Sequence, residues 1–319
     1  LDTRRSTVVV AGAGSGKTTV LVARYLATLK DGVPGRPNVT PADVVAITFT
    51  DAAARNLRRR VVAERPDLDV DEAPISTIHA FAARLLRMEL VARAAGLGTG
   101  DFGVVSPLER RALSRKVIEA WWDASVRAPG VAVRRVAAEW NRATIVRVLE
   151  ALAADRTTTE RWLATVGDST PAALEDAWRR AFADAIQAKG AEDGARRLPV
   201  YADVAVALVA VAREVLSAIE AEKARRDLLD HDDLLARLDH ALDAAPVARA
   251  LGDRFAAVLV DEYQDVDPTQ RSIIAKLVGA RDGAPTRPGA LFVVGDPKQA
   301  IYRFRGARPA AFADAVAMA

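Results

Sequence analysis

The stretch Thr7–Thr19, which reads TVVVAGAGSGKTT, constrains the fold more than any other part of the chain. An apolar, β-branched run ends at a glycine-rich turn, and the turn ends in Lys17-Thr18. This layout predicts a buried parallel strand and a loop whose backbone N–H groups surround phosphate oxygens, with the positive end of the next helix pointing at them. If the stretch follows the pattern G-x-x-x-x-G-K-[ST], Lys17 would reach the β/γ-phosphates and the Thr18 hydroxyl would hold Mg²⁺.

Ala11 occupies the first glycine position of that pattern and is small enough for a tight exit from a strand. The alternative is an ordinary Gly/Ser turn that happens to end in Lys-Thr. The strand-like run before the turn and the apolar helical pattern after it favour the phosphate loop.

Whole-chain properties exclude several classes. The 319 residues contain no cysteine, which rules out disulfides, thiolate zinc sites and iron–sulfur clusters within this segment. No apolar run approaches the roughly 20 residues needed to cross a bilayer, and the N-terminus shows no signal peptide. A net charge of +3 permits a nucleic-acid partner without requiring one. A cytoplasmic location is the expectation.

The pattern changes twice along the chain. Residues 1–95 and 226–319 alternate short apolar strands with helices, which predicts a parallel sheet with ligands at the carboxyl ends of its strands. Residues 96–225 are helical in period and predict an all-helical insertion in this α/β domain.

Several element boundaries can be predicted from the same patterns. A capping box opens a helix at Ser106-Pro107-Leu108-Glu109, and a second is expected at Asp267–Gln270. One helix is expected from about Ile78 to Ala95, and the last long helix of the insertion from about Pro199 to Ile219.

The segment VLVDEYQDVD, residues 258–267, places two acids at the end of an apolar strand. Opposite a phosphate loop, Asp261 would hold Mg²⁺ through water and Glu262 would polarise the attacking water. A strand end with two surface acids is the alternative, and the phosphate loop in the same predicted sheet argues against it.

The segment VVGDPKQAIYRFRGA, residues 293–307, follows another strand. Gln299 could sense the γ-phosphate, and aromatic residues on an adjacent loop could stack on unpaired bases. Taken alone, Tyr302 and Phe304 are equally consistent with core packing.

Together with AGAGSGKTT, ITFTDAAARNLRRRV and STIHAFAARLL, these two segments resemble, in order, the motifs of the UvrD/Rep/RecB group of superfamily 1 DNA helicases. The resemblance covers about residues 6–95 and 226–319. It implies a RecA-like P-loop NTPase fold, with the helical block in the position of the family's inserted subdomain.

The resemblance also implies roles for individual residues. Glu262 is the catalytic base, with Lys17 and Gln299 as further catalytic residues, and Thr18 and Asp261 hold the metal. The residues implied in ATP binding are Ala11, Gly12, Ala13, Gly14, Ser15, Gly16, Lys17, Thr18, Thr19, Gln264 and Gln299. Those implied on the single-stranded DNA path are Phe49, Thr50, His79, Tyr302, Phe304 and Arg305.

Two of the residues implied on the DNA path, Phe304 and His79, need separate comment. Phe304 stands where the repair helicases usually have a base-stacking Trp, and base–aromatic stacking of ~1–3 kcal/mol remains compatible with it. His79 could instead cap a helix.

Pro297-Lys298 and the segment LDHDDLL, residues 229–235, look more like the RecB/AddA helicase–nuclease branch, with His231 in place of that branch's Phe. Asp230, Asp232 and Asp233 beside a histidine also raise a metal-site interpretation, but a capped helix start is favoured.

The implied activity is that of an ATP-dependent DNA helicase or translocase, 3′ to 5′, in DNA repair or recombination, with ATP and Mg²⁺ as cofactors. Single-stranded DNA, junctions of single- and double-stranded DNA and the second RecA-like lobe are the implied partners, with a nuclease domain or subunit in the RecB/AddA branch. Arg110, Arg111, Arg134 and Arg135 would lie near duplex phosphates.

The resemblance implies that this segment is the first motor lobe only, because the second lobe is not recognisable in it. The glutamine motif that reads adenine, expected before the first strand, is absent or truncated. Two alternatives stay open: the motor subunit of a helicase–nuclease, and a non-motor DNA-binding module that uses ATP as a switch.

Overall fold

A computed structural model describes residues 2–12, 14–167, 169–181, 192–280, 286–299 and 315. The chain divides into two compact units. One comprises Leu1–Asp101 and His231–Ala319, and the other comprises Phe102–Asp230. The sequence places the division a few residues earlier at each crossing, at 95/96 and 225/226.

The first unit is built on a five-stranded parallel sheet in the order β1-β7-β6-β2-β3. The strands are β1 (Thr7–Val10), β2 (Val44–Thr48), β3 (Ile75–Thr77), β6 (Ala257–Val260) and β7 (Leu291–Gly295). The predicted parallel α/β sheet is confirmed. Because β7 pairs with both β1 and β6, the carboxyl ends of these three strands lie next to one another.

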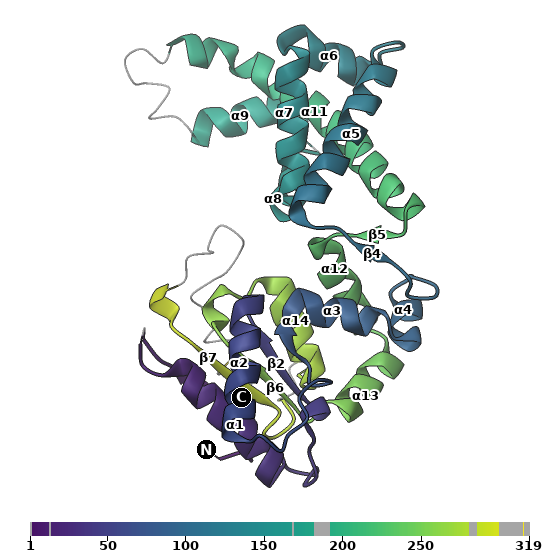
Figure 1. The fold of residues 1–319 in the computed structure, drawn as a ribbon. Helices are drawn as coiled ribbons and strands as arrows, with labels where there is room; N and C mark the ends of the chain where they lie inside the picture. The colour runs from purple at the N-terminus through teal and green to yellow at the C-terminus, as the bar shows by residue number, and fades with distance from the viewer. Residues whose placement is uncertain are drawn as a thin grey trace. The chain divides into compact units, whose positions relative to one another are not determined.

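Helices flank this sheet (Figure 1). They are α1 (Lys17–Asp31), α2 (Asp51–Glu64), α3 (Ile78–Leu86), α4 (Glu89–Ala94), α12 (His231–Ala241), α13 (Ala245–Arg254) and α14 (Pro268–Leu277). Alternate strand residues such as Val44, Leu259 and Phe292 share one core cluster with α1 and α2. Their neighbours Val45 and Val258 are equally buried on the opposite face, so the sheet is covered on both sides.

Local sequence signals explain where several of these helices begin. The side chain of Thr50 accepts a hydrogen bond from Ala53 N and caps α2, and Thr77 does the same for α3 through Ala80 N. Asp267 caps α14 by accepting from Gln270 N.

The single helix expected over residues 78–95 is wrong. The chain forms α3 and α4, separated at Arg87-Met88, because Met88 takes an extended backbone conformation.

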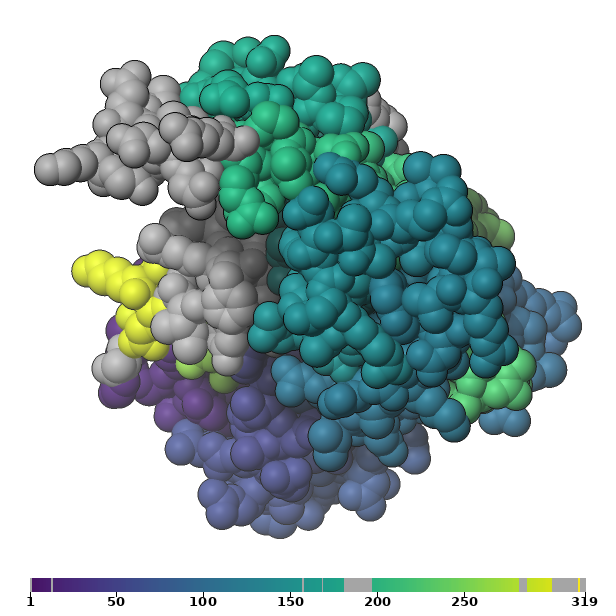
Figure 2. Space-filling view, turned by 90° about the horizontal axis from the view of Figure 1, so that it is seen from above, coloured from purple at the N-terminus to yellow at the C-terminus, as the bar shows by residue number. Residues whose placement is uncertain are grey.

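The second unit contains six described helices: α5 (Pro107–Ser125), α6 (Val131–Glu139), α7 (Arg142–Ala154), α8 (Arg156–Gly167), α9 (Pro171–Ala181) and α11 (Glu192–Arg225). Its main core joins α5, α6, α7 and α11 through residues such as Ile118, Val136, Leu149 and Val215. The blue-to-teal surface of α5–α8 in the space-filling view is continuous (Figure 2). The expected start of the last helix at Pro199 is wrong, since α11 contains Pro199 in its interior.

The sequence patterns missed one pair of short strands in this unit. Strands β4 (Gly103–Val104) and β5 (Leu228–Leu229) pair in parallel, so the chain enters and leaves the helical unit on neighbouring strands. Across the described ranges of both units, none of the helices is both long and apolar enough to span a membrane.

Candidate nucleotide-binding site

The turn between β1 and α1 has the form of a phosphate loop. Ala11 N donates to Gly295 O at 2.9 Å, which starts the loop beside β7. Gly14 and Gly16 have φ of +70° and +84°, values that glycine adopts without steric cost. A Cβ on Gly14 would meet no described heavy atom within 4 Å, so the loop is open on that side.

The N-terminus of α1 follows directly from this loop. Gly16 is its N-cap, and in the described part of the chain no side chain caps the helix. The first backbone N–H groups of a helix lack partners within the helix and carry a partial positive charge. The end of α1 can therefore receive an anion in addition to the loop itself.

Lys17, in the first turn of α1, meets the acidic end of β6. Its Nζ donates to Glu262 Oε2 at 2.6 Å, although the two residues are 245 positions apart in the sequence. The Lys17 side chain is only 10% exposed and that of Glu262 34%. The structure thus brings together the lysine and the acid that the sequence singled out separately.

Asp261 lies at the same place, one residue before Glu262. Its backbone N donates to Ile47 O at 2.9 Å, and its Oδ1 accepts from Glu262 N at 3.0 Å. Burial raises the pKa of Asp261 above the ordinary 3.8, and the charge of Glu262 raises it further, while the Glu262 N–H and Lys17 oppose these effects. A cation at this carboxylate would offset both unfavourable effects.

Glu262 has a backbone conformation that is uncommon for a residue with a side chain. Its φ and ψ are +49° and +46°, in the left-handed region. Such conformations persist only where the surroundings hold them, and they concentrate at functional sites. Here the Lys17 ion pair and the bond from Glu262 N to Asp261 are part of those surroundings.

The end of β7 completes the arrangement. Asp296 N donates to Gln264 Oε1 at 2.9 Å, and Gln264 Nε2 donates to Glu262 Oε2 at 2.8 Å. Gln299 lies on the short turn η3 (Pro297–Gln299), and its backbone N donates to Asp296 O at 2.9 Å. The three strand ends are therefore linked by hydrogen bonds.

The donors present suit Mg²⁺ bound to a triphosphate. Asp261 supplies a carboxylate, and the Thr18 hydroxyl lies in the same helical turn as Lys17. Among the described residues, no group of three or more His, Cys, Asp or Glu could hold a metal. Mg²⁺ commonly uses one or two protein oxygens, with phosphate oxygens and waters as its other ligands, so this small donor set fits.

Three of the six residues expected on the DNA path, Phe49, Thr50 and His79, lie in the described part of the chain. Phe49 is 42% exposed after β2, next to Thr50 at the start of α2.

The ring of His79 stacks on that of His231, with 4.6 Å between their centroids. His79 is not the N-cap of α3, because Thr77 takes that position. Ala13, Tyr302, Phe304 and Arg305 lie outside the described residues.

Of the arginines expected near duplex DNA, Arg110 and Arg135 contact other protein groups in the second unit. Arg110 donates to Ala154 O and lies 3.8 Å from Asp230 Oδ2, and Arg135 pairs with Asp203. Asp230 also accepts from the buried Lys223 at 3.0 Å. The metal-site interpretation of Asp230 therefore gives way to an ion-pair cluster.

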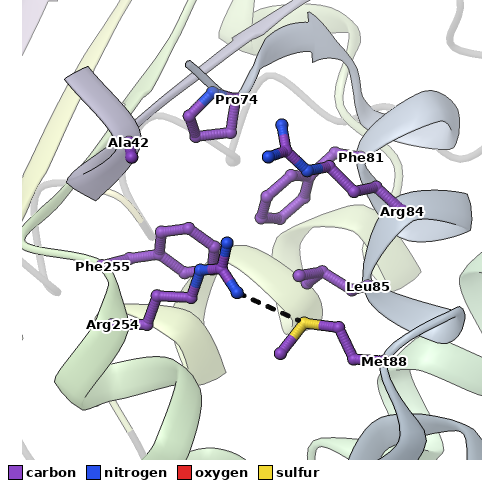
Figure 3. Close-up of a pocket in the computed structure, with 8 residues that line it drawn as sticks. All are labelled: Ala42, Pro74, Phe81, Arg84, Leu85, Met88, Arg254 and Phe255. Atoms are coloured by element: carbon purple, nitrogen blue, oxygen red, sulfur yellow. Dashed lines mark hydrogen bonds between the residues drawn. The ribbon is translucent and has the colours of Figure 1, made fainter. Parts of the chain in front are cut away.

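A separate hollow of about 50 Å³ lies at the other end of the sheet (Figure 3). Ala42, Pro74 and Phe255 precede β2, β3 and β6, which places the hollow near the amino ends of these strands. Figure 3 shows the Phe81 and Phe255 rings on its wall and the bond from Arg254 to the sulfur of Met88. Ligand pockets are typically ~300–1,000 Å³, so this one is too small for a nucleotide.

Sequence reasoning missed Asp296 as a member of the site. Asp296 is 8% exposed, and its Oδ2 is the atom nearest to a Cβ placed on Gly12, at 3.9 Å. Its position directly after an apolar strand, next to the strand that leads into the phosphate loop, was the available signal. His231 was likewise read as a substitution and not as the ring partner of His79.

Comparison with known proteins agrees with this geometry. The model of the UvrD/REP helicase N-terminal domain matches residues 1–317. The ATP-dependent DNA helicase UvrD2 of Mycobacterium tuberculosis (strain ATCC 25618 / H37Rv) is 32% identical, over 97% of this chain and 37% of that protein. UvrD1 of the same strain is 30% identical, over 94% and 32%.

The RecBCD enzyme subunit RecB of Mycolicibacterium smegmatis is 29% identical, over 98% of this chain and 27% of that protein. The chain thus spans between 27% and 37% of the length of these relatives. Given the family match over nearly its whole length, the chain belongs to the UvrD/Rep helicase family, whose N-terminal domain it matches.

Proposed function

We propose that this chain binds ATP with Mg²⁺ at the carboxyl ends of β1, β6 and β7, as the first motor lobe of an ATP-dependent DNA helicase or translocase. The observation that carries the proposal is the 2.6 Å contact between Lys17 Nζ and Glu262 Oε2. Phosphoryl transfer needs a cation on the γ-phosphate and a group that orients the attacking water, and these two groups already face each other.

The residues of the site have separate tasks in this proposal. The loop backbone and the N-terminus of α1 bind phosphate oxygens, and Lys17 exchanges Glu262 for the β/γ-phosphates. Glu262 is then free to orient water and accept its proton at the carboxylate. Thr18 and Asp261 would hold Mg²⁺, which, when bound, neutralises phosphate charge.

The DNA side of the proposal rests on the family and on the names of the relatives. Phe49, Thr50 and His79, with Tyr302, Phe304 and Arg305, would contact single-stranded DNA near its junction with duplex. We propose 3′ to 5′ translocation in repair or recombination, in the cytoplasm, with a second RecA-like lobe as partner. The unit Phe102–Asp230 would be the family's inserted subdomain.

A second candidate is the motor subunit of a helicase–nuclease. The RecB relative of Mycolicibacterium smegmatis, at 29% identity, favours it. A nuclease domain or subunit would then be a further partner, and nuclease activity that depends on ATP would distinguish this candidate from a UvrD-like helicase.

Binding of MgATP to Lys17→Ala tests the site. Because Lys17 would make charge-assisted bonds to phosphate, we expect the affinity to fall about 30-fold or more. The matched control is Lys30→Ala, which removes an exposed lysine in the last turn of the same helix. Equal affinities of the two variants, measured by equilibrium titration with fluorescent ATP, would refute the site.

Glu262→Gln separates a motor from a non-motor binding module. In the longer protein that we propose, MgATP affinity should stay within about threefold while DNA-stimulated hydrolysis falls about 100-fold or more. Glu64→Gln, at the exposed end of α2, is the control. A module that uses ATP only as a switch would show no difference between the two.

The isolated chain should hydrolyse ATP very slowly and unwind no DNA. An arginine finger from a second lobe is worth ~10³–10⁵ in turnover. Robust unwinding of a tailed duplex by the 319 residues alone contradicts the assignment as a single motor lobe.

A further inference from the structure

Gln264 is more deeply buried than the acids beside it. It lies on the short turn η2 (Tyr263–Asp265) after β6 and is 2% exposed. Its Nε2 donates to Glu262 Oε2 at 2.8 Å, and its Oε1 accepts from the backbone N of Asp296 at 2.9 Å. One side chain thus connects the loop after β6 to the loop after β7.

The orientation of this amide is determined by its partners. A backbone N–H can only donate, so the Gln264 oxygen must face Asp296. The NH₂ group must then face Glu262 Oε2, which accepts from it. The amide therefore supports the position of the Glu262 carboxylate relative to Lys17, which donates to the same oxygen.

This hydrogen-bonded bridge, from Glu262 through the Gln264 amide to Asp296 N, connects a strained residue after β6 to the turn after β7. Glu262 has the left-handed backbone described above and needs support from its surroundings. Asp296 begins the turn that leads to Gln299, with Lys298 N donating to Asp296 Oδ1 at 3.0 Å and Gln299 N to Asp296 O. A shift of this turn would pull on the Gln264 oxygen and displace the other end of the amide.

We propose that Gln264 is a positioning residue that holds the carboxylate of Glu262 in register with the loop after β7. This inference rests on the proposed ATP hydrolysis at the same site. It differs from the role that the family resemblance implies, contact with the γ-phosphate, because both ends of the amide are engaged by protein groups. Movement of the β7 loop would then change hydrolysis through Glu262, with little effect on nucleotide affinity.

Two variants separate the two ends of the bridge. Gln264→Glu keeps the size and an oxygen for Asp296 N but replaces the donor to Glu262 with a negative charge. Gln264→Leu removes both bonds. Gln270→Leu, on the neighbouring helix α14, makes the same chemical change outside the bridge and serves as the control.

Amide hydrogen exchange at Asp296, measured by NMR on the nucleotide-free chain, tests the bridge itself. In Gln264→Leu the exchange rate should rise about tenfold or more, because the buried amide loses its acceptor. In Gln264→Glu and in the control it should stay within about threefold of the wild type. Wild-type exchange in Gln264→Leu would overturn the bridge. If the leucine variant fails to fold, hydrolysis by Gln264→Glu still tests the positioning role.

MgATP affinity and single-turnover release of labelled phosphate, both measured in the longer protein that we propose, test the positioning role. Both variants should bind MgATP within about threefold of the wild type and hydrolyse it about tenfold more slowly or worse, since misplacing a catalytic group by about 1 Å can cost ~100-fold. Hydrolysis at the wild-type rate in Gln264→Glu would overturn the role. A parallel loss of MgATP affinity would also overturn it, in favour of direct nucleotide contact.

Failure of the proposed function would look different. In that case Lys17→Ala would bind MgATP like the wild type, while the exchange of Asp296 would still report whether Gln264 joins the two loops.

Discussion

At the scale of single residues, Asp261 and Glu262 concentrate unfavourable features that a nucleotide with its metal would relieve. Asp261 is a partly buried carboxyl beside another acid, and both effects raise its pKa. Glu262 carries the left-handed backbone and shares its carboxylate between Lys17 and Gln264. These two carboxylates are suited to a ligand that supplies positive charge.

The raised pKa of Asp261 predicts how stability depends on pH. The folded chain takes up this proton at a higher pH than the unfolded chain, whose aspartate has an ordinary pKa of 3.8. Between these two values the folded state binds more protons, so the Asp261 contribution to stability falls as pH rises through that window.

We expect the wild type to become more stable relative to Asp261→Asn as pH falls from 7 toward 4. The free energy of unfolding of the wild type, minus that of the variant, should therefore increase over this range. Comparing the two proteins removes the parallel contribution of Asp267, whose pKa burial also raises. Urea unfolding of both proteins at several pH values measures this difference. A constant difference across the range would contradict the assigned shift.

At the scale of elements, the start of β7 is locked against the N-terminal segment. Arg24 of α1 is 1% exposed, and it donates to the carbonyl oxygens of Arg5 and Gly289 at 3.2 Å. Gly289 has φ of +75°, and a Cβ there would lie 2.2 Å from Thr3 O. The backbone approaches so closely that only glycine fits, which sets the register of β7 beside β1.

Gly289→Ala should therefore destabilise the chain by about 2–4 kcal/mol, the sum of left-handed strain and overpacking. The control is Gly35→Ala, with φ of +81° and no described heavy atom within 4 Å of the added Cβ. The control should lose only about 1 kcal/mol. Denaturant unfolding gives both values, and equal losses would show that the close approach to Thr3 carries no energetic weight.

At the scale of the whole molecule, the two units have separate cores. One lies between the sheet and α1 and α2, and the other joins the helices α5, α6, α7 and α11. The residues proposed to bind nucleotide all belong to the unit that contains the sheet. A defect in the helical core should therefore leave the proposed nucleotide site intact.

Leu149→Ala tests this separation. Leu149 is 1% exposed in the helical core, so its truncation should destabilise that unit by about 2–5 kcal/mol. Leu108→Ala, at a residue 78% exposed on α5, should cost less than about 0.5 kcal/mol. MgATP affinity should stay within about twofold in both variants. A large loss of affinity in Leu149→Ala alone would show that the two units act as one cooperative body.

Much of the first unit could be predicted because its signals are local. Apolar runs of four or five residues marked β1, β2, β6 and β7, and the capping residue Asp267 marked the start of α14. The site residues Lys17, Asp261 and Glu262 could be named because each stands directly after a buried strand or its turn. Parallel strands place such positions at one edge of the sheet, so their convergence followed from the pattern.

Other features depend on contacts that no local pattern contains. The pairing of β4 with β5 joins segments far apart in the sequence. The break at Met88 and the start of α11 before Pro199 run against the local helix signals. The left-handed backbone of Glu262 and the orientation of Gln264 depend on Lys17 and Asp296. The parallel sheet and the residues at its carboxyl edge follow from local patterns in the chain, because periodicity and turn chemistry act over a few residues. The pairing of those side chains depends on the folded molecule, because hydrogen-bond geometry exists only once distant strands lie side by side.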